Sequence, residues 1–242
     1  MTKAFQGTVA IVTGAGRGIG EAIAQAFGSQ GARVALVSHT ESELRRVAKS
    51  IETAGGQALV CVADVSDATA VAGVFDRVER EWQGADVLVN NAGVFVHAPI
   101  VDQTTEDWDR VLAVNARGVF LCGQRFLRSC RYRGSGGSIV NISSISGIRG
   151  PQHKFPGFAS YIASKFAVVG LTEAFAIEGR EFGVRTNCIA PGSVDTEMLR
   201  KAAPHLKTQI KPEQIAQTVL QLCDPKVSSH LNAAVIEVFA DL

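Results

Sequence analysis

The regular alternation of short apolar runs with longer amphipathic segments constrains the fold of this 242-residue chain more than any other feature. The short runs are rich in β-branched residues and almost continuously apolar, which is typical of parallel strands covered on both faces. We predict strands at Thr8–Thr13, Arg33–Ser38, Ala58–Val62, Val87–Asn90, Ser138–Ile142, Arg185–Ile189 and Val235–Phe239. Repeated strand–helix alternation predicts an α/β fold: a single doubly wound Rossmann domain over residues 1–242, with a seven-stranded parallel sheet and helices on both faces.

Helical periodicity fills the segments between these strands. One helix is expected from Gly20 to about Ser29, and another after Ser66, which is a candidate N-cap. A long helix is predicted from about Ser160 to Arg180. A late helix is predicted over Pro212–Cys223, because proline is tolerated in the first turn.

Composition excludes several classes of function. The net charge of +1 gives no bulk attraction to nucleic acid or to an acidic membrane surface. No apolar stretch reaches the roughly 20 residues of a membrane span, and the N-terminus lacks the apolar core of a signal peptide. The five cysteines form no CxxC pair and no cluster with zinc spacing, so they are expected to be small buried hydrophobes. We therefore expect a cytoplasmic protein with no metal, no nucleic-acid partner and no membrane partner.

A glycine-rich turn follows the first predicted strand and opens the first helix. Its spacing is Gly14-x-x-x-Gly18-x-Gly20, and Gly16 adds a Gly-x-Gly. Glycines let the backbone approach a phosphate, and the helix N-terminus offers free N–H groups to a pyrophosphate. The context predicts a dinucleotide site; a tight turn without a ligand is the alternative.

A tyrosine and a lysine lie four residues apart, in Tyr161-Ile162-Ala163-Ser164-Lys165, and so share one face of the long helix. A lysine ammonium beside a phenol favours the phenolate and lowers the phenol pKa. Such a tyrosine is able to exchange a proton near neutral pH, as carbonyl reduction and alcohol oxidation require. Together with a dinucleotide that carries hydride, the pair predicts a nicotinamide-dependent oxidoreductase.

The end of the second strand bears on the choice of nucleotide. NAD enzymes place an acid there to hold the ribose 2′-hydroxyl, but this stretch reads Ser38-His39-Thr40, with no acid before Glu41. A 2′-phosphate would meet no repelling carboxylate and would lie near Arg17. We therefore predict that NADP(H) is preferred and that NAD(H) is possible. The alternative is that Arg17 touches only the pyrophosphate or solvent.

The ordered set of motifs resembles the short-chain dehydrogenase/reductase family over nearly the whole chain. Within that family the chain looks most like the 3-oxoacyl-[acyl-carrier-protein] reductases and related carbonyl reductases. The motifs are Thr13-Gly14-x-x-x-Gly18-x-Gly20, Asp64-Val65, Asn90-Asn91-Ala92-Gly93, Asn115, Ser144, Tyr161-x-x-x-Lys165 and Pro191-Gly192-x-x-x-Thr196.

The resemblance implies a role for each matched residue. Tyr161 would be the general acid in reduction and the base in oxidation, and Lys165 would lower its pKa and bind the nicotinamide ribose. Ser144 would hydrogen-bond the substrate oxygen, with Ser143 as the competing assignment, and Asn115 would hold a proton-relaying water. The expected cofactor-binding set is Gly14, Arg17, Gly18, Ile19, Gly20, Ser38, His39, Thr40, Asp64, Val65, Asn91, Ala92, Gly93, Tyr161, Lys165, Pro191, Gly192, Val194 and Thr196.

Two departures from the family pattern concern the substrate. Ser144 and Tyr161 are 17 residues apart, and the extra length falls in the loop 150–157, where His153, Lys154 or Phe155 could contact substrate. The segment 197–211 is short for a substrate lid, and the usual Asp-Gly-Gly ending is absent. Expected pocket residues are Val94, Phe95, Val96, Ile145, Ile148, Phe155 and Val194, with Arg149 and Lys154 near the entrance.

The predicted activity interconverts a carbonyl and a secondary alcohol on a small molecule, either a 3-oxoacyl thioester or a general ketone. A non-catalytic NADP-binding regulatory protein is the alternative. The helix after Lys165 is apolar around much of its circumference, so it needs cover on more than the sheet side. We therefore expect a homotetramer, or a homodimer, formed through this helix and the one around 107–122.

Overall fold

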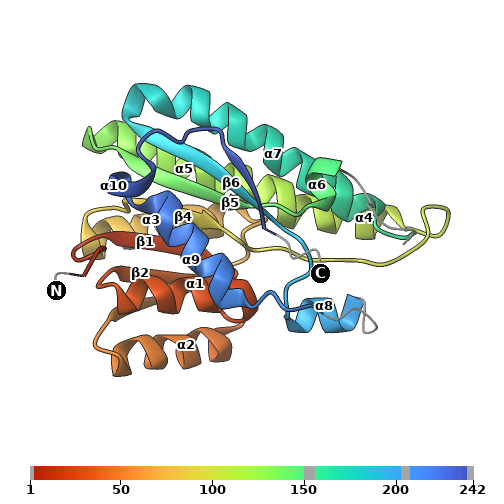
Figure 1. Ribbon diagram of the computed structural model, residues 1–242, viewed down its shortest axis with the longest axis horizontal. Coiled ribbons are helices and arrows are strands. Elements are labelled where there is room, and N and C mark those ends of the chain that lie inside the picture. The colour runs from red at the N-terminus through yellow and green to blue at the C-terminus, as the bar shows by residue number, and fades with distance from the viewer. Residues whose placement is uncertain (1–2, 150–155, 203–207, 239–242) are drawn as a thin grey trace.

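The computed structural model describes residues 3–149, 156–202 and 208–238. Seven parallel strands form one sheet in the order β3-β2-β1-β4-β5-β6-β7, which confirms the predicted fold class (Figure 1). The strands are β1 Val9–Thr13, β2 Arg33–Ser38, β3 Gln57–Val62, β4 Val87–Asn90, β5 Gly137–Ile142, β6 Val184–Pro191 and β7 Val235–Val238. All seven predicted strands are present, and β6 runs two residues beyond its predicted end.

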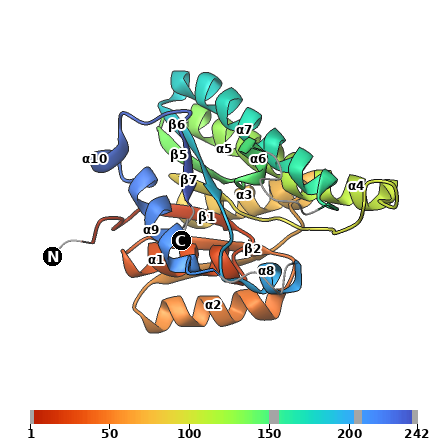
Figure 2. The same ribbon diagram turned by 45° about the vertical axis from the view of Figure 1, so that its right-hand side comes forward.

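Helices connect the strands and cover both faces of the sheet (Figures 1 and 2). They are α1 Gly18–Ser29, α2 Glu41–Thr53, α3 Ala68–Trp82, α4 Thr105–Leu112, α5 Gly118–Arg133, α6 Ser146–Arg149, α7 Ala159–Gly179, α8 Glu197–Ala202, α9 Pro212–Cys223 and α10 Pro225–Ser228. A π-helical turn, Ala113–Arg117, joins α4 to α5, and a 3-10 turn, Arg180–Phe182, follows α7.

Alternating side chains of each strand enter two separate cores. In β1, Ala10 and Val12 pack with residues of α1, α2 and α9, whereas Val9 and Ile11 pack with residues of α3, α5 and α7. Both sets are almost completely buried. A strand with both faces covered needs apolar residues at every position, which explains the continuous apolar runs in the sequence.

Two predicted helix starts have different outcomes. Pro212 occupies the first turn of α9, as predicted. The N-cap of α3 is Asp67 and not Ser66, so that prediction is wrong. The Asp67 carboxylate accepts hydrogen bonds from the backbone N–H groups of Thr69 and Ala70, while the Ser66 hydroxyl donates to Asp64. A carboxylate at this position also interacts favourably with the helix dipole.

The long helix α7 is more apolar than predicted. Together with the 3-10 turn that follows, residues 159–182 reach a mean hydropathy of 1.3 over an 18-residue window, enough in length and composition to span a membrane. The prediction that no stretch of this kind exists is therefore wrong. In the fold, α7 packs along β6 and β5 as one layer of the α/β architecture, and core helices commonly pass this test.

Candidate active site

The candidate site lies at the carboxyl edge of the sheet, where the strand order reverses between β1 and β4. Doubly wound sheets bind ligands at this position, because the loops that leave the two neighbouring strands diverge there. The glycine turn leaves β1, the segment 91–94 leaves β4, and Ser143 and Ser144 leave β5. Three segments that are distant in sequence therefore meet at one edge.

The glycine turn has the shape of a phosphate cradle. Gly14 and Gly18 have φ values of +64° and +58°, which side chains rarely adopt. A Cβ atom on Gly14 would lie 2.8 Å from Asn91 Nδ2, and one on Gly20 would lie 2.1 Å from the Gly14 carbonyl oxygen. Only glycine fits at either position, and the α1 N-terminus begins directly behind the turn. These residues therefore fit a dinucleotide pyrophosphate.

Asn91 and Thr13 fix this turn to β4. Asn91 Nδ2 donates to the carbonyl oxygens of Thr13 and Gly14 at 3.0 and 3.3 Å. The Thr13 hydroxyl accepts from the backbone N–H groups of Asn91 and Ala92, both at 3.0 Å. The side chain of Asn91 thus serves the architecture of the cradle. The Thr13 hydroxyl also holds the turn to β4, although Thr13 was not among the predicted site residues.

Tyr161 and Ser144 meet at the end of β5. The two hydroxyl groups are hydrogen-bonded, and Ser144 is 9% exposed. Burial raises the pKa of the Tyr161 phenol, and the Ser144 hydrogen bond lowers it in part. Lys165 was expected to lower the pKa of Tyr161, but desolvation of the phenol has the larger effect and raises it. The reason is physical: the phenol packs against the Phe95 ring and is desolvated, so its charged form is poorly stabilised.

Lys165 lies behind Tyr161 and is itself desolvated. Its Nζ donates to the Ile142 carbonyl oxygen at 2.9 Å and lies 5.6 Å from the centre of the Tyr161 ring. Burial lowers the pKa of Lys165 to about 8, and neighbouring Cys188 opposes the shift. A lysine with such a pKa gains and loses its proton close to neutral pH.

The two serines at the end of β5 have different partners. The Ser143 hydroxyl donates to the Lys165 carbonyl oxygen at 2.8 Å, and Ser143 is 3% exposed. The Ser144 hydroxyl accepts from the Ser146 backbone N–H at 3.2 Å and reaches Tyr161. The hydroxyl of Ser143 is therefore directed at the α7 backbone, whereas that of Ser144 is next to the predicted acid. This geometry supports Ser144 in the competition that the sequence left open.

Asn115 is completely buried in the π-helical turn between α4 and α5. Its side-chain amide pairs with the backbone of Val94 on both sides, accepting at 2.8 Å and donating at 2.9 Å. It also donates to the Ser164 hydroxyl, which donates in turn to the Tyr161 carbonyl oxygen. The side chain thus links the β4 exit to α7, and π-helical turns recur at functional sites. The predicted water relay remains a prediction.

A cluster of aromatic rings adjoins Tyr161 through Phe95. Phe95 packs edge-on against Tyr161 with ring centres 5.6 Å apart, and Phe158 packs on Phe95 at 5.0 Å. His97 contacts Phe158 at 5.3 Å and hydrogen-bonds the Pro156 carbonyl oxygen. Of these rings, Phe95 is the one that packs on Tyr161, and it was a predicted pocket residue. His97 lies on the same segment as Phe95 and Phe158 directly precedes α7, and nothing in local sequence marks either of them.

A carboxylate stands near the end of β2, contrary to the prediction. A Cβ atom on Gly16 would lie 2.7 Å from Glu43 Oε2 and 3.4 Å from the Ser38 hydroxyl. Arg17 Nη1 lies 3.8 Å from Glu43 Oε1 and 3.2 Å from Glu197 Oε2. The acid was missed because it comes from the first turn of α2, five residues beyond the strand end, and the helix folds it back over the glycine turn.

The remaining predicted cofactor residues lie around this edge. The Asp64 carboxylate accepts from the Ser66 backbone and hydroxyl, and Val65 packs at the start of α5. His39 is exposed, and the Thr40 backbone N–H donates to the Ser38 hydroxyl at 3.2 Å.

The β6 exit lies against the glycine turn. A Cβ atom on Gly18 would lie 3.5 Å from Thr196 Cγ2, and the Gly192 backbone N–H donates to the Val238 carbonyl oxygen. Pro191 is buried at the end of β6, Ile19 packs on the α1–α9 core, and Val194 is buried within that core. Because Val194 belongs to the core, its predicted place in the substrate pocket is not supported.

Several predicted substrate contacts remain outside the description. His153, Lys154 and Phe155 are among residues that the structure does not describe. Ile145 and Ile148 are half-buried around α6. Arg149 pairs with Glu237 of β7 at 2.6 Å, so the last strand anchors this arginine near the site.

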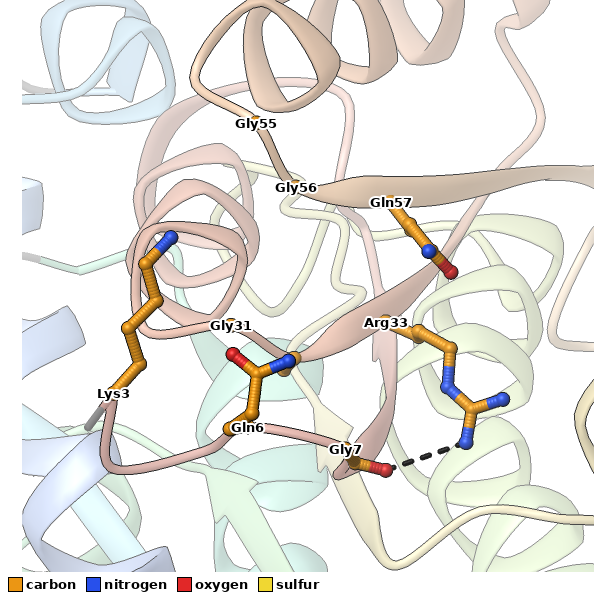
Figure 3. A pocket seen from close by; sticks show the side chains of 9 residues that line it. Lys3, Gln6, Gly7, Gly31, Arg33, Gly55, Gly56 and Gln57 are labelled. Carbon is orange, nitrogen blue, oxygen red and sulfur yellow. Dashed lines mark hydrogen bonds between the residues drawn. The ribbon is translucent and has the colours of Figure 1, made fainter.

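A different hollow lies at the amino edge of the sheet, far from these groups. Lys3, Gln6, Arg33 and Gln57 contribute side chains to it, and Arg33 hydrogen-bonds the Gly7 carbonyl oxygen (Figure 3). Arg33 and Gln57 open β2 and β3, so this hollow is at the opposite edge from Tyr161. Among residues 3–149, 156–202 and 208–238, no group of three or more His, Cys, Asp or Glu side chains could hold a metal ion.

Comparison with known proteins matches this geometry. Residues 8–207 match the family model described as short chain dehydrogenase. The chain is 34% identical to the 3-oxoacyl-[acyl-carrier-protein] reductase FabG of Thermotoga maritima, with 97% of each chain covered. It is 35% identical to a 3beta-hydroxysteroid dehydrogenase of Mediterraneibacter gnavus, over 85% of this chain and 73% of that one. The fold superimposes on a short-chain type dehydrogenase/reductase of Mycobacterium marinum with a TM-score of 0.91 and 32% identity, covering 97% of this chain and 95% of that one.

Proposed function

The chain belongs to the short-chain dehydrogenase family, and from this premise we propose that it is an NADP(H)-dependent oxidoreductase that interconverts a ketone and a secondary alcohol. We assign residues 1–242 to one catalytic domain. The observation that carries the proposal is the Ser144–Tyr161 hydrogen bond at the carboxyl edge of the sheet, with buried Lys165 directly behind it. A bound nicotinamide nucleotide would supply hydride to the carbonyl carbon.

Tyr161 acts as the acid in reduction. Its raised pKa keeps the phenol protonated at neutral pH, so a proton is available for the carbonyl oxygen as that oxygen becomes an alcohol. Ser144 donates a hydrogen bond to the same oxygen and stabilises its developing negative charge. In oxidation the roles reverse, and Tyr161 accepts the proton of the alcohol.

Lys165 supports the proton transfer from a fixed position. Its Nζ is held on the Ile142 carbonyl oxygen, and its pKa of about 8 lets it share a proton with the site near neutral pH. When protonated, it favours the Tyr161 phenolate that remains after reduction. Asn115 keeps this arrangement together by linking Val94 to the α7 turn that carries Tyr161.

The preference for NADP(H) over NAD(H) rests on the charges near the end of β2. Ser38 offers a hydroxyl where an NAD enzyme has an acid, and Arg17 directly follows Gly16, whose Cβ position lies 3.4 Å from that hydroxyl. Arg46 adds a second guanidinium, whose Nη2 donates to the Gly16 carbonyl oxygen at 3.0 Å. These groups can hold a 2′-phosphate, although Glu43 stands among them.

The aromatic surroundings of Tyr161 favour a general ketone over a 3-oxoacyl thioester. Phe95 packs edge-on against the phenol and Phe158 packs on Phe95, an apolar environment that suits a flat or cyclic apolar carbonyl compound. A thioester on an acidic carrier would use surface cations such as Arg149, but that guanidinium is already paired with Glu237. One relative is named as a 3beta-hydroxysteroid dehydrogenase, which agrees with this substrate class.

Turnover of a carbonyl panel tests the proposal. Cyclic ketones, diketones and acetoacetyl thioesters would each be offered with NADPH and with NADH, and nucleotide oxidation followed by absorbance. Reduction of cyclic ketones supports the proposed class, and reduction of acetoacetyl thioesters alone refutes it. Nucleotide binding without turnover of any carbonyl would favour the alternative, a non-catalytic NADP-binding regulatory protein.

We further propose a cytoplasmic homotetramer, with a homodimer as the simpler assembly. Phe166 and Ile177 of α7 are 46% and 70% exposed, and Phe120 of α5 is 41% exposed. Large apolar side chains on two neighbouring helices indicate a surface that a second copy of the chain would cover.

A further inference from the structure

Arg17 lies between two carboxylates from different parts of the chain. Glu43 reaches it from the first turn of α2, and Glu197 reaches it from α8, at 3.8 and 3.2 Å. Arg17 is 59% exposed at its side chain, and Glu43 is 32% exposed. The arginine that would attract a 2′-phosphate is therefore already paired with the protein's own acids.

Glu43 also lies close to the position that reads the ribose. Its Oε2 and the Ser38 hydroxyl both lie within 3.4 Å of the point where a Gly16 Cβ would stand. The end of β2 is where Rossmann folds contact the ribose 2′ position. The pKa of Arg46 is raised chiefly by its hydrogen bond to Glu21, and the charge of Glu43 adds to that rise, so Glu43 acts on both guanidinium groups at this site.

We propose that Glu43 sets the balance between NADP(H) and NAD(H) by competing with a 2′-phosphate for Arg17. This inference rests on the proposed nucleotide-dependent function. A 2′-phosphate must displace Glu43 from Arg17 and must also face its carboxylate at short range. Like charges on a half-exposed surface repel appreciably, whereas an uncharged 2′-hydroxyl meets neither cost. Glu43 therefore weakens, without abolishing, the attraction that Ser38, Arg17 and Arg46 exert on a 2′-phosphate.

The test is the affinity for two nucleotide fragments that differ only in this phosphate. ADP-ribose and 2′-phospho-ADP-ribose would be titrated into the full-length protein by isothermal titration calorimetry at fixed ionic strength. In Glu43→Gln we expect affinity for the 2′-phosphorylated fragment to rise about tenfold, as loss of one close like charge implies. Affinity for ADP-ribose should change by less than about twofold.

Glu41→Gln is the matched control. Glu41 lies in the same first turn of α2 and carries the same charge, but it pairs with Arg45 at 2.5 Å. A general electrostatic effect of α2 would appear in both variants, and an equal gain in Glu41→Gln would overturn the proposal. Unchanged thermal unfolding of each variant shows that the fold is intact.

A double-mutant cycle with Arg17→Ala isolates the competition. If Glu43 acts by capturing Arg17, the gain from Glu43→Gln shrinks to about twofold or less when Arg17 is absent. An undiminished gain would contradict the capture of Arg17. Equal changes for both fragments, or none, would overturn the inference while leaving the proposed function in place. A native chain that binds neither fragment would refute both.

Discussion

At the scale of single residues, the two serines at the end of β5 have separable duties. Ser144→Ala removes the hydrogen bond to Tyr161 and to a substrate oxygen, so we expect kcat/KM to fall about 10²- to 10³-fold with little change in stability. Ser143→Ala removes the hydrogen bond to the Lys165 carbonyl oxygen, and we expect it to lower the free energy of unfolding by about 1–3 kcal/mol. Steady-state kinetics and urea unfolding of both variants measure the contrast. The reverse pattern would make Ser143 the substrate-binding serine.

Tyr161 is expected to be the residue without which no proton reaches the substrate. Tyr161→Phe keeps the ring that packs edge-on against Phe95 and removes only the hydroxyl. We expect turnover to fall by about 10²- to 10⁴-fold or more, the usual contribution of a general acid, with nucleotide affinity within about threefold of native. Steady-state kinetics measure the loss of turnover, and nucleotide titration measures whether nucleotide affinity is retained. A variant that keeps most of its activity would remove Tyr161 from the reaction.

Lys165 gives stability a distinctive pH dependence. Its folded pKa of about 8 lies below the ordinary value of 10.5, so between these two pH values the unfolded chain binds a proton that the folded chain has released. Stability attributable to Lys165 therefore rises with pH across that window, by about 3 kcal/mol in total. Tyr161 and buried Cys188 have raised pKa values and act in the opposite direction at higher pH.

The native protein and Lys165→Met together isolate this contribution. Urea unfolding of both at intervals from pH 7 to 10.5 gives the difference in unfolding free energy, from which the cysteines and Tyr161 largely cancel. The unfolding free energy of the native protein should rise relative to that of Lys165→Met as the pH rises above 8. A constant difference would show that Lys165 keeps an ordinary pKa in the fold.

At the scale of elements, the turn from β1 into α1 tolerates no side chain at Gly20. A Cβ atom there would lie 2.1 Å from the Gly14 carbonyl oxygen, and backbone cannot move as a flexible side chain does. We expect Gly20→Ala to cost about 3 kcal/mol of unfolding free energy and to weaken nucleotide binding. Gly73 of α3 is the control, since a Cβ atom there meets nothing within 4 Å.

The control substitution should act in the opposite direction. Gly73→Ala fills open space on an exposed helix position and is expected to stabilise the protein by about 0.5–1 kcal/mol. Thermal or urea unfolding shows whether Gly20→Ala destabilises the protein and whether Gly73→Ala stabilises it. Equal effects would mean that helix propensity, and not the contact with Gly14, governs Gly20.

At the scale of the whole molecule, the exposed apolar side of α7 predicts self-association. Phe166→Glu places a charge on that side and should shift the assembly toward monomer, while Phe166→Leu keeps the surface apolar and should preserve it. Light scattering after size-exclusion chromatography measures the mass of each. A native protein that is monomeric at working concentration would refute the proposed assembly.

The sequence alone determined the strands, the fold class, the glycine turn and the Tyr161–Lys165 pair, because each depends on a local pattern. Apolar runs predict buried strands, and a spacing of four places two side chains on one helix face. Local patterns were less reliable at the ends of elements, as the N-cap at Asp67 in place of Ser66 shows. The helix expected around 107–122 contains a π-helical turn at Ala113–Arg117, in which Asn115 pairs with the Val94 backbone.

Only the tertiary structure decided what surrounds these groups. Glu43 folds back over Gly16 from α2, Phe158 closes on Phe95 from another loop, and Ser143 turns its hydroxyl to the Lys165 backbone. These contacts join residues whose separation along the chain gives no signal. They also set the directions of the pKa shifts of Tyr161 and Lys165, because desolvation depends on how the whole chain packs around a group and not on its neighbours in sequence.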